Sequence, residues 1–113
     1  MTAAHLARAQ AYLDARLHDP GLTLLAASRD LGFSVRYLHQ LFREVDSTPR
    51  TWLYDQRLRR ARTMLSRRTA PALTITEVAA RVGFKDPSHF SRAFKALYGF
   101  SPAEFRRREH ANA

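Results

Sequence analysis

Two stretches of the sequence carry hydrogen-bonding side chains at intervals of three and four residues, so that each set shares one face of a helix. The first face consists of Arg36, His39, Gln40 and Arg43, and the second of Ser88, Ser91, Arg92 and Lys95. Arginine can bridge O6 and N7 of guanine, glutamine can bridge N6 and N7 of adenine, and serine can bond either base. Both faces therefore suit the edges of base pairs, although the solvated side of any helical bundle is also polar.

Catalysis and metal binding are poorly served by the residues that could perform them. The candidate nucleophile and base are Ser88 with His89, or His39 with a distant carboxylate, and neither pair has a group that would orient it. The five histidines are scattered, no two of them stand four residues apart, and the chain has no cysteine. We expect no enzyme, no metal site and no cofactor.

The balance of charge points to a polyanionic partner. Nineteen lysines and arginines stand against ten acidic residues in a chain of 113, which gives a net charge of +9. A hydrophobic share of 45% and a charged share of 26% are typical of a folded protein of one domain or two small lobes. No stretch resembles a membrane span or a signal peptide. We expect a cytoplasmic, nucleoid-associated protein.

An internal repeat organises the chain, because residues 22–49 are echoed by residues 73–102. The matching pairs are Gly32-Phe33 with Gly83-Phe84, Phe42-Arg43 with Phe94-Lys95, and Thr48-Pro49 with Ser101-Pro102. Each copy has the pattern of a helix, a tight turn and a second helix, which is the layout that enters a DNA major groove. The repeat and the equal phases of the two polar faces favour DNA binding over a solvated bundle.

Residues with capping preferences mark the expected helix ends. In the second copy they are a Thr74–Glu77 capping box, Gly83 after the first helix, Asp86 and Pro87 opening the second, and Gly99 closing it. In the first copy they are Ser34 and Asp46. Outside the copies, a first helix runs from a Thr2 cap to Pro20-Gly21, a linking helix covers residues 50–66, and Pro102 opens a last helix.

The sequence thus predicts an all-α protein of about seven helices without strands. Its parts are a first lobe over residues 1–48, a linking helix over 49–68 and a second lobe over 69–113. The expected buried residues are Leu6, Ala9, Leu13 and Leu17, then Val35, Leu38, Leu41, Phe42 and Val45, then Leu53, Leu58, Ala61 and Leu65, and finally Pro87, Phe90, Ala93, Phe94 and Leu97. Phe33, Trp52, Tyr54, Met64, Phe84 and Phe105 are expected to pack in the core or against the lobes.

The linking region also carries an arginine-rich face, made of Arg57, Arg59, Arg60, Arg62, Arg67 and Arg68. One interpretation is the solvated face of a connecting helix. A membrane-surface or RNA-binding face is the other, because a basic amphipathic helix has the same pattern.

Residues 82–95, VGFKDPSHFSRAFK, and 98–106, YGFSPAEFR, make the chain similar to a known family. It resembles the DNA-binding domain of the AraC/XylS family of bacterial transcription regulators, over about residues 5 to 108. The resemblance implies two helix-turn-helix lobes joined by a long helix, and each lobe lays one helix in successive major grooves on one side of double-stranded DNA. It also implies a transcription regulator, an activator among other roles.

The resemblance assigns roles to individual residues. Base-reading positions fall on Arg36, His39, Gln40, Ser88, Ser91 and Arg92. Phosphate-binding positions fall on Ser34, Arg43, Arg50, Thr51, Lys85, His89 and Lys95, and on the helix start at Pro102-Ala103. Asp46 departs from the family pattern because glycine is usual there, and Pro87 removes a polar side chain from a position that reads a base in some relatives.

Two alternatives stay open for the function. The first alternative is that the 113 residues are the C-terminal DNA-binding part of a longer, effector-sensing regulator. The second is that they form a module that acts mainly by contacting RNA polymerase or another regulator. We expect one monomer of this chain to bind one DNA site.

Overall fold

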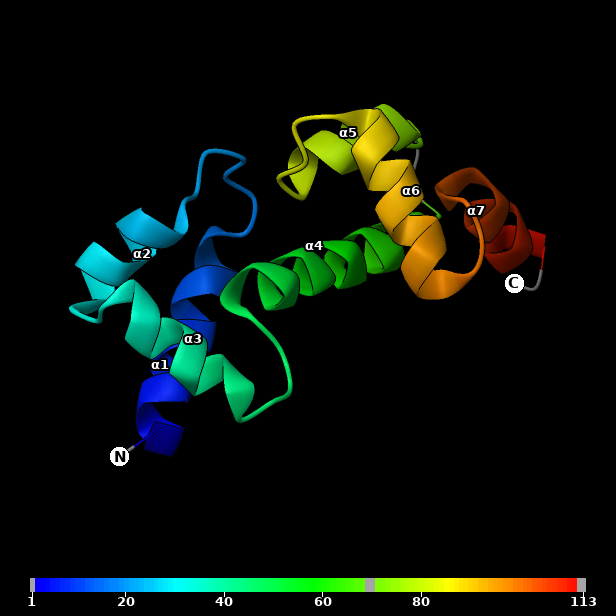
Figure 1. Ribbon diagram of the computed structural model, residues 1–113. Coiled ribbons are helices and arrows are strands. Elements are labelled where there is room, and N and C mark those ends of the chain that lie inside the picture. Colours follow the sequence, from blue (N-terminus) through cyan, green and yellow to red (C-terminus); the bar gives the residue numbers. More distant parts are fainter. Residues whose placement is uncertain (1, 69–70, 112–113) are drawn as a thin grey trace. The chain divides into compact units, whose positions relative to one another are not determined.

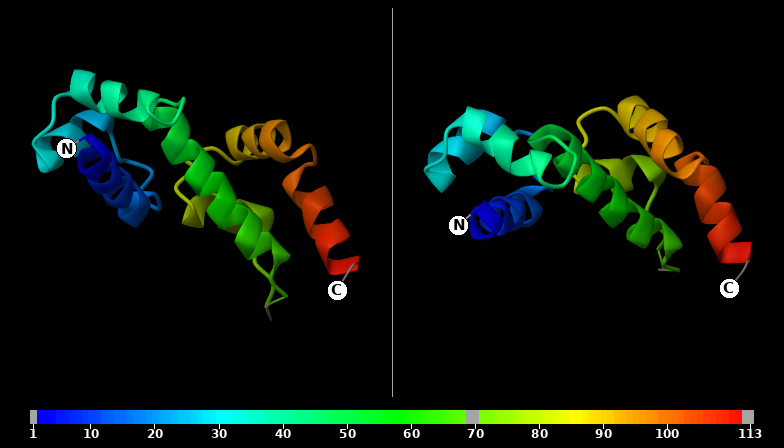
Figure 2. Two further views of the ribbon diagram at one scale, coloured as in Figure 1. Left: turned by 90° about the horizontal axis from the view of Figure 1, so that it is seen from below. Right: turned by 60° about the horizontal axis from the view of Figure 1, so that its bottom comes forward.

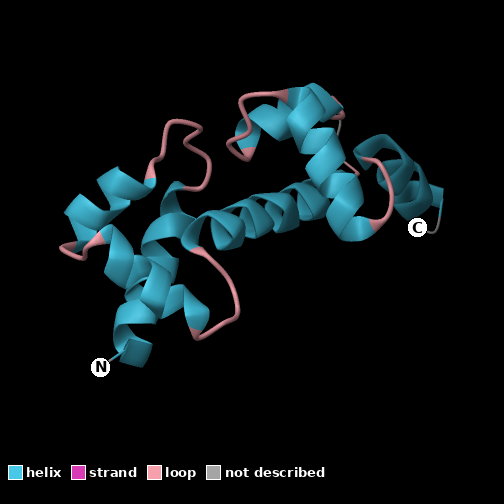
Figure 3. Ribbon diagram, viewed as in Figure 1, coloured by secondary structure: helices cyan, strands magenta, loops and turns pink. Residues whose placement is uncertain are grey.

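The computed structural model describes residues 2–68 and 71–111, and these residues form seven helices and no strand (Figures 1 and 3). The helices are α1 Thr2–Arg16, α2 Leu24–Leu31, α3 Val35–Arg43, α4 Pro49–Ser66, α5 Ile75–Arg81, α6 Pro87–Tyr98 and α7 Pro102–Ala111. The all-α prediction with seven helices is confirmed. In the part of the chain described, no helix has both the length and the apolar character needed to cross a membrane.

Two compact units divide the chain, residues 1–56 and residues 57–113. The boundary lies inside α4, so that the linking helix contributes its first turns to unit 1 and its last turns to unit 2. Each unit contains one copy of the sequence repeat.

Unit 1 is built on three mutually packed helices, α1, α2 and α3 (Figure 2). The buried residues of α1 recur every three or four positions, as an amphipathic helix requires, and they include Leu6, Ala9 and Leu13. They meet Phe42 of α3, whose ring lies 5.7 Å from that of Trp52 on α4. The sequence pattern predicted the burial of these residues of α1 and of Phe42 correctly.

Unit 2 is held by a chain of aromatic rings. Phe90 of α6 contacts Phe84 at 5.2 Å and Phe94 at 5.9 Å between ring centroids, and Phe94 contacts Phe105 of α7 at 5.5 Å. These separations are those of favourable aromatic pairs. Phe90 and Phe94 have no exposed surface, which fixes the inner side of α6.

Most of the expected helix ends are confirmed. The Ser34 hydroxyl accepts from the Tyr37 N–H at 3.0 Å, and the Asp86 carboxylate accepts from the Ser88 N–H at 2.9 Å. Thr74 and Glu77 form the reciprocal capping box. Gly32, Gly83 and Gly99 have positive φ, as helix-terminating glycines do.

The first helix differs from the prediction at both ends. Thr2 is the first residue of α1 and not its cap, and α1 ends at Arg16, before Pro20-Gly21. The Asp19 N–H bonds the Arg16 carbonyl at 3.0 Å, so a turn replaces the last helical turn that we expected. Leu17 is still buried, although it lies beyond the helix.

Three apolar residues expected in the core are exposed. Val45 is 44% exposed because α3 ends at Arg43 and the turn that follows leaves the helical phase. Leu97 is 46% exposed in the last turn of α6, and Pro87 is exposed in the first turn. Both ends of α6 extend past the buried Phe90 and Phe94.

The arginine-rich face of α4 is not uniformly solvated. Arg57 is only 2% exposed, whereas Arg59, Arg60 and Arg62 are exposed. Arg57 stands four residues from both Leu53 and Ala61, which are buried, so it lies in their row along the helix. Arg57 is therefore not part of the exposed arginine-rich face, whichever of the two interpretations of that face holds.

Asp46 closes α3 in the left-handed region, with φ of 51°, and no other described non-glycine residue has positive φ. Its N–H bonds the Arg43 carbonyl and the Ser47 N–H bonds the Phe42 carbonyl, both at 3.0 Å. This pair of bonds is the Schellman motif, in which glycine usually takes the position of Asp46.

We expect Asp46→Gly to stabilise unit 1 by about 1 kcal/mol, because a side chain in the left-handed region costs roughly that much. Chemical denaturation followed by circular dichroism measures the change. The matched control is Glu44→Gly, which lies two residues earlier at φ of −59° and should destabilise the protein. A lower stability for Asp46→Gly than for the parent would contradict the assignment.

Candidate nucleic-acid interface

The polar face of α3 is presented by a helix with one firmly buried side. Leu38, Leu41 and Phe42 are at most 1% exposed. Ser34 caps the helix start, so the chain enters the helix in a fixed phase. On the other side Arg36, Gln40 and Arg43 are exposed and His39 is half-buried. The four predicted residues of this face lie together on α3.

A second set of contacts ties α3 to α1. Nδ1 of His5 lies 2.6 Å from the Tyr37 hydroxyl, and the Phe33 ring lies 5.0 Å from His5 and 5.2 Å from Tyr37. The Arg8 guanidinium lies 4.7 Å from the centre of the Phe33 ring and donates to the Leu31 carbonyl. These contacts hold the turn between α2 and α3, and with it the start of α3.

Sequence reasoning missed the contacts of His5, which was considered as one of five scattered histidines. A signal was present, because His5 stands four residues before Ala9, in the row that continues through Leu13 and Leu17. Tyr37 carries no such signal, since its partner is 32 residues away in the chain.

The face of α6 repeats that of α3 in the other unit. Asp86 and Pro87 open the helix, and Gly99 closes it at φ of 84°. Opposite the buried Phe90 and Phe94, Ser88, Arg92 and Lys95 are exposed and Ser91 is half-buried. The second predicted face is therefore also brought together, with smaller side chains at two of its four positions.

The expected phosphate-binding residues differ in their surroundings. Ser34, Thr51 and Lys85 are exposed, and so is Arg50, whose guanidinium lies 4.9 Å from the centre of the Tyr54 ring. His89 is half-buried, with its ring edge-on to Phe84 at 5.3 Å. The His89 ring is thereby held in one orientation beside the start of α6.

The starts of α4 and α7 have the same construction. At α7, Ser101 takes the N–H of Glu104 on its hydroxyl at 3.2 Å and the N–H of Phe105 on its carbonyl at 2.8 Å. Pro102 has no N–H, so Ala103 carries the one N–H of this turn that Ser101 does not engage. At α4, Thr48 likewise takes the N–H groups of Thr51 and Trp52 and leaves that of Arg50.

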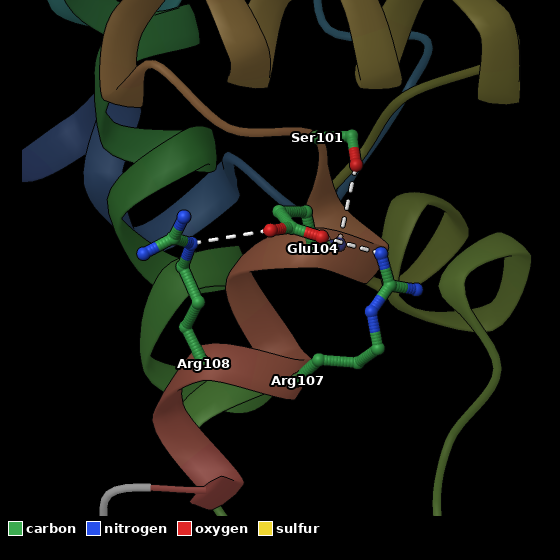
Figure 4. A network of polar contacts seen from close by, with 4 residues as sticks. All are labelled: Ser101, Glu104, Arg107 and Arg108. Carbon is green, nitrogen blue, oxygen red and sulfur yellow. Dashed lines mark hydrogen bonds and ion pairs between the residues drawn. The ribbon is translucent and has the colours of Figure 1, made fainter.

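Charge at the start of α7 is balanced locally (Figure 4). The Glu104 carboxylate accepts from Arg107 at 2.5 Å and from Arg108 at 3.2 Å. The bond from Arg107 and, to a smaller extent, the bond from Arg108 hold the pKa of Glu104 below its usual value. Glu104 therefore stays ionised while its charge is opposed by two arginines. Among residues 2–68 and 71–111, no cluster of histidine, aspartate and glutamate could hold a metal ion.

Two helix-turn-helix copies, each with a capped second helix and an exposed polar face, define a two-lobed helix-turn-helix DNA-binding domain. A family profile described as "Helix-turn-helix domain" matches residues 27–108. The chain belongs to the AraC/XylS family of transcription regulators, which is not a family of enzymes.

Relatives of known role and structure support this membership. The chain is 40% identical over 106 residues to the transcriptional activator NphR of a Rhodococcus species, and 34% identical over 96 residues to the arabinose operon regulatory protein of Escherichia coli. The two matches include 94% and 84% of this chain, respectively, but only 30% and 32% of the relatives' own length. It thus spans about a third of their length.

Among solved structures, the DNA-binding domain of AdpA in complex with a target DNA is similar with a TM-score of 0.84 and 29% identity, over 95% of this chain and 94% of that one. The C-terminal domain of AraT from Geobacillus stearothermophilus is similar with a TM-score of 0.82 and 30% identity, over 92% and 84%. Both likenesses extend across both repeat copies.

We expect Glu104→Gln to lower the melting temperature at neutral pH, because the variant cannot form the two arginine bonds to an ionised carboxylate. A carboxyl whose pKa is lower in the folded than in the unfolded state stabilises the fold at pH values above its unfolded-state pKa. This contribution is lost as the pH falls through the folded-state pKa. The melting temperatures of parent and variant should therefore converge below the usual glutamate value of about 4.3. Glu109→Gln, an exposed change on the same helix, is the control and should have the smaller effect. A gap that persists in acid would contradict this assignment.

Proposed function

We propose that the chain binds one asymmetric site in double-stranded DNA, with α3 and α6 in successive major-groove segments. The observation that carries this proposal is the pair of matched faces, each opposite a buried aromatic side. A C-terminal role within a longer, effector-sensing regulator is compatible with it, since the chain spans about a third of its relatives. NphR is an activator by name, and we propose activation here too, in a protein working at the nucleoid.

Base reading is proposed for Arg36, His39, Gln40, Ser88, Ser91 and Arg92. Among these, Arg36, Gln40 and Arg92 can form two parallel bonds to one base. The half-buried His39 and Ser91 reach less far than their exposed neighbours. Phosphate binding is proposed for Ser34, Arg43, Arg50, Thr51, Lys85, His89 and Lys95.

The helix starts at Arg50 and Ala103 are proposed as two further phosphate contacts. Each presents one N–H that the capping residue leaves unused, and a helix N-terminus attracts an anion. Such contacts fix the register of the protein on DNA without reading its sequence. Contact with RNA polymerase stays a prediction, because the residues proposed to contact DNA do not define a surface for a protein partner.

One monomer should occupy one site of about 20 base pairs, because both helix-turn-helix copies are in one chain and successive major-groove segments lie about 34 Å apart. Native mass spectrometry of the complex measures the stoichiometry. An obligate complex of two chains on a palindrome would contradict the proposal.

We expect Gln40→Ala and Arg92→Ala each to relax sequence preference at one or two base pairs, in different halves of the site. Removal of a bidentate base contact costs about 1–3 kcal/mol at its own base pair. Selection from randomised DNA measures the preference at every position. The half read by α3 should carry more information, because Pro87 and two serines leave α6 fewer bidentate groups.

The control is Arg60→Ala, on the exposed side of α4. Its preference profile should equal that of the parent. If the Arg92→Ala profile were also identical to that of the parent, α6 would have no reading role.

A further inference from the structure

The net positive charge of this protein is confined to one of its two units. Residues 1–56 contain six arginines and six acidic residues, so unit 1 is formally neutral. Residues 57–113 contain 13 basic and four acidic residues, so unit 2 carries the whole net charge of +9. Two units with the same helix-turn-helix layout therefore differ completely in their attraction to a polyanion.

In unit 1, part of the positive charge is also engaged within the unit. Three of the six arginines lie over aromatic rings, with the guanidinium carbon less than 5 Å from the ring centre. These pairs are Arg8 with Phe33, Arg16 with Tyr12 and Arg50 with Tyr54. Two exposed acids, Glu44 and Asp46, follow closely after the last residue of α3. Attraction to phosphates therefore contributes little to DNA binding by unit 1, and its binding depends on its contacts with bases.

Unit 2 has the opposite balance of net charge, and only part of its larger positive charge is engaged within the unit. Arg62 and Arg108 lie over the Tyr98 and Phe100 rings, respectively, and Glu104 accepts bonds from Arg107 and Arg108.

Lys85 and Lys95 are exposed around α6, and Arg59, Arg60 and Arg62 are exposed on the unit 2 part of α4, whereas Arg92 is the arginine of α6 proposed to read a base. The polar face of α6 holds two serines, each with a single hydroxyl, and Pro87 offers no polar group. Unit 2 therefore has many groups for phosphates, which are the same in every sequence, and few for bases.

Building on the proposed function, we propose that the units divide the work of binding. Unit 2 holds the chain on DNA of any sequence through phosphate contacts, and unit 1 docks only where α3 meets its own bases. Nonspecific binding depends on phosphate neutralisation, and it permits sliding along the duplex. The neutral unit 1 then samples successive sequences without being retained at the wrong ones.

The test compares two charge-matched pairs of substitutions in the full chain. Binding is measured by fluorescence anisotropy over a range of salt concentrations, on a duplex recovered by selection and on a pool of random duplexes of equal length. Lys85→Gln with Lys95→Gln should weaken binding to both DNAs alike, so the ratio of specific to random affinity is kept. The salt slope should flatten by about 1.8, at roughly 0.9 for each phosphate that is no longer neutralised.

Arg43→Gln with Arg50→Gln removes the same charge from unit 1. These residues meet phosphates only in the specific complex, so the ratio of specific to random affinity should fall. All four substituted side chains are exposed, Arg50 over the Tyr54 ring, and melting curves check that both variants fold. If both pairs lower the ratio equally, or the unit 2 pair lowers it more, the division of work is wrong.

A gain-of-charge variant tests the idea from the other direction. Glu44→Gln with Asp46→Asn gives unit 1 a charge of +2, and asparagine tolerates the left-handed region as aspartate does. Affinity for random duplexes should rise and the ratio should fall. Unchanged affinity for random DNA would overturn the division of work. A parent chain that shows no preference for the selected duplex would overturn the proposed function itself, and this result is distinct from the others.

Discussion

The burial of large side chains on one side of α3 and α6 is the constraint on which the rest of the structure depends. Phe42, Phe90 and Phe94 have no exposed surface, and each ring would cost several kcal/mol to remove, because aromatic-to-alanine changes in cores cost about 3–5 kcal/mol. A helix of about ten residues is marginal by itself. The packing therefore supplies the stability of both helices and also decides which residues face outwards.

Capping complements this packing by fixing where each helix starts and stops. Ser34 and Asp86 open α3 and α6, and Asp46 and Gly99 close them in the left-handed region. If either helix began one residue later, its side chains would keep the same phase around the helix axis. The capping hydrogen bond that fixes the direction of the helix relative to the preceding loop would be lost. The His5 and Tyr37 contact adds a long-range restraint to the same turn in unit 1.

The two units share one helical layout but differ in net charge. Their helix order, turns and caps correspond, yet one unit is neutral and the other carries +9. Exposed charges contribute little to the stability of a fold, so they are free to vary between copies while the buried aromatic positions are not. Unequal charge on equal scaffolds is thus compatible with both copies folding in the same way.

The sequence by itself determined the number of helices, most of their caps and the composition of both polar faces. These features follow from hydrogen bonds and side-chain phases that extend over three or four residues, so Ser34, Thr74 and Asp86 could be identified locally. The tertiary structure alone decided the burial of Arg57, the exposure of Val45 and Leu97, and the contact of His5 with Tyr37. The exposure of Val45 and Leu97 depends on where α3 and α6 end relative to their buried rings, and the contact of His5 with Tyr37 joins segments 32 residues apart in the chain. The burial of Arg57 depends on which element covers that side of α4.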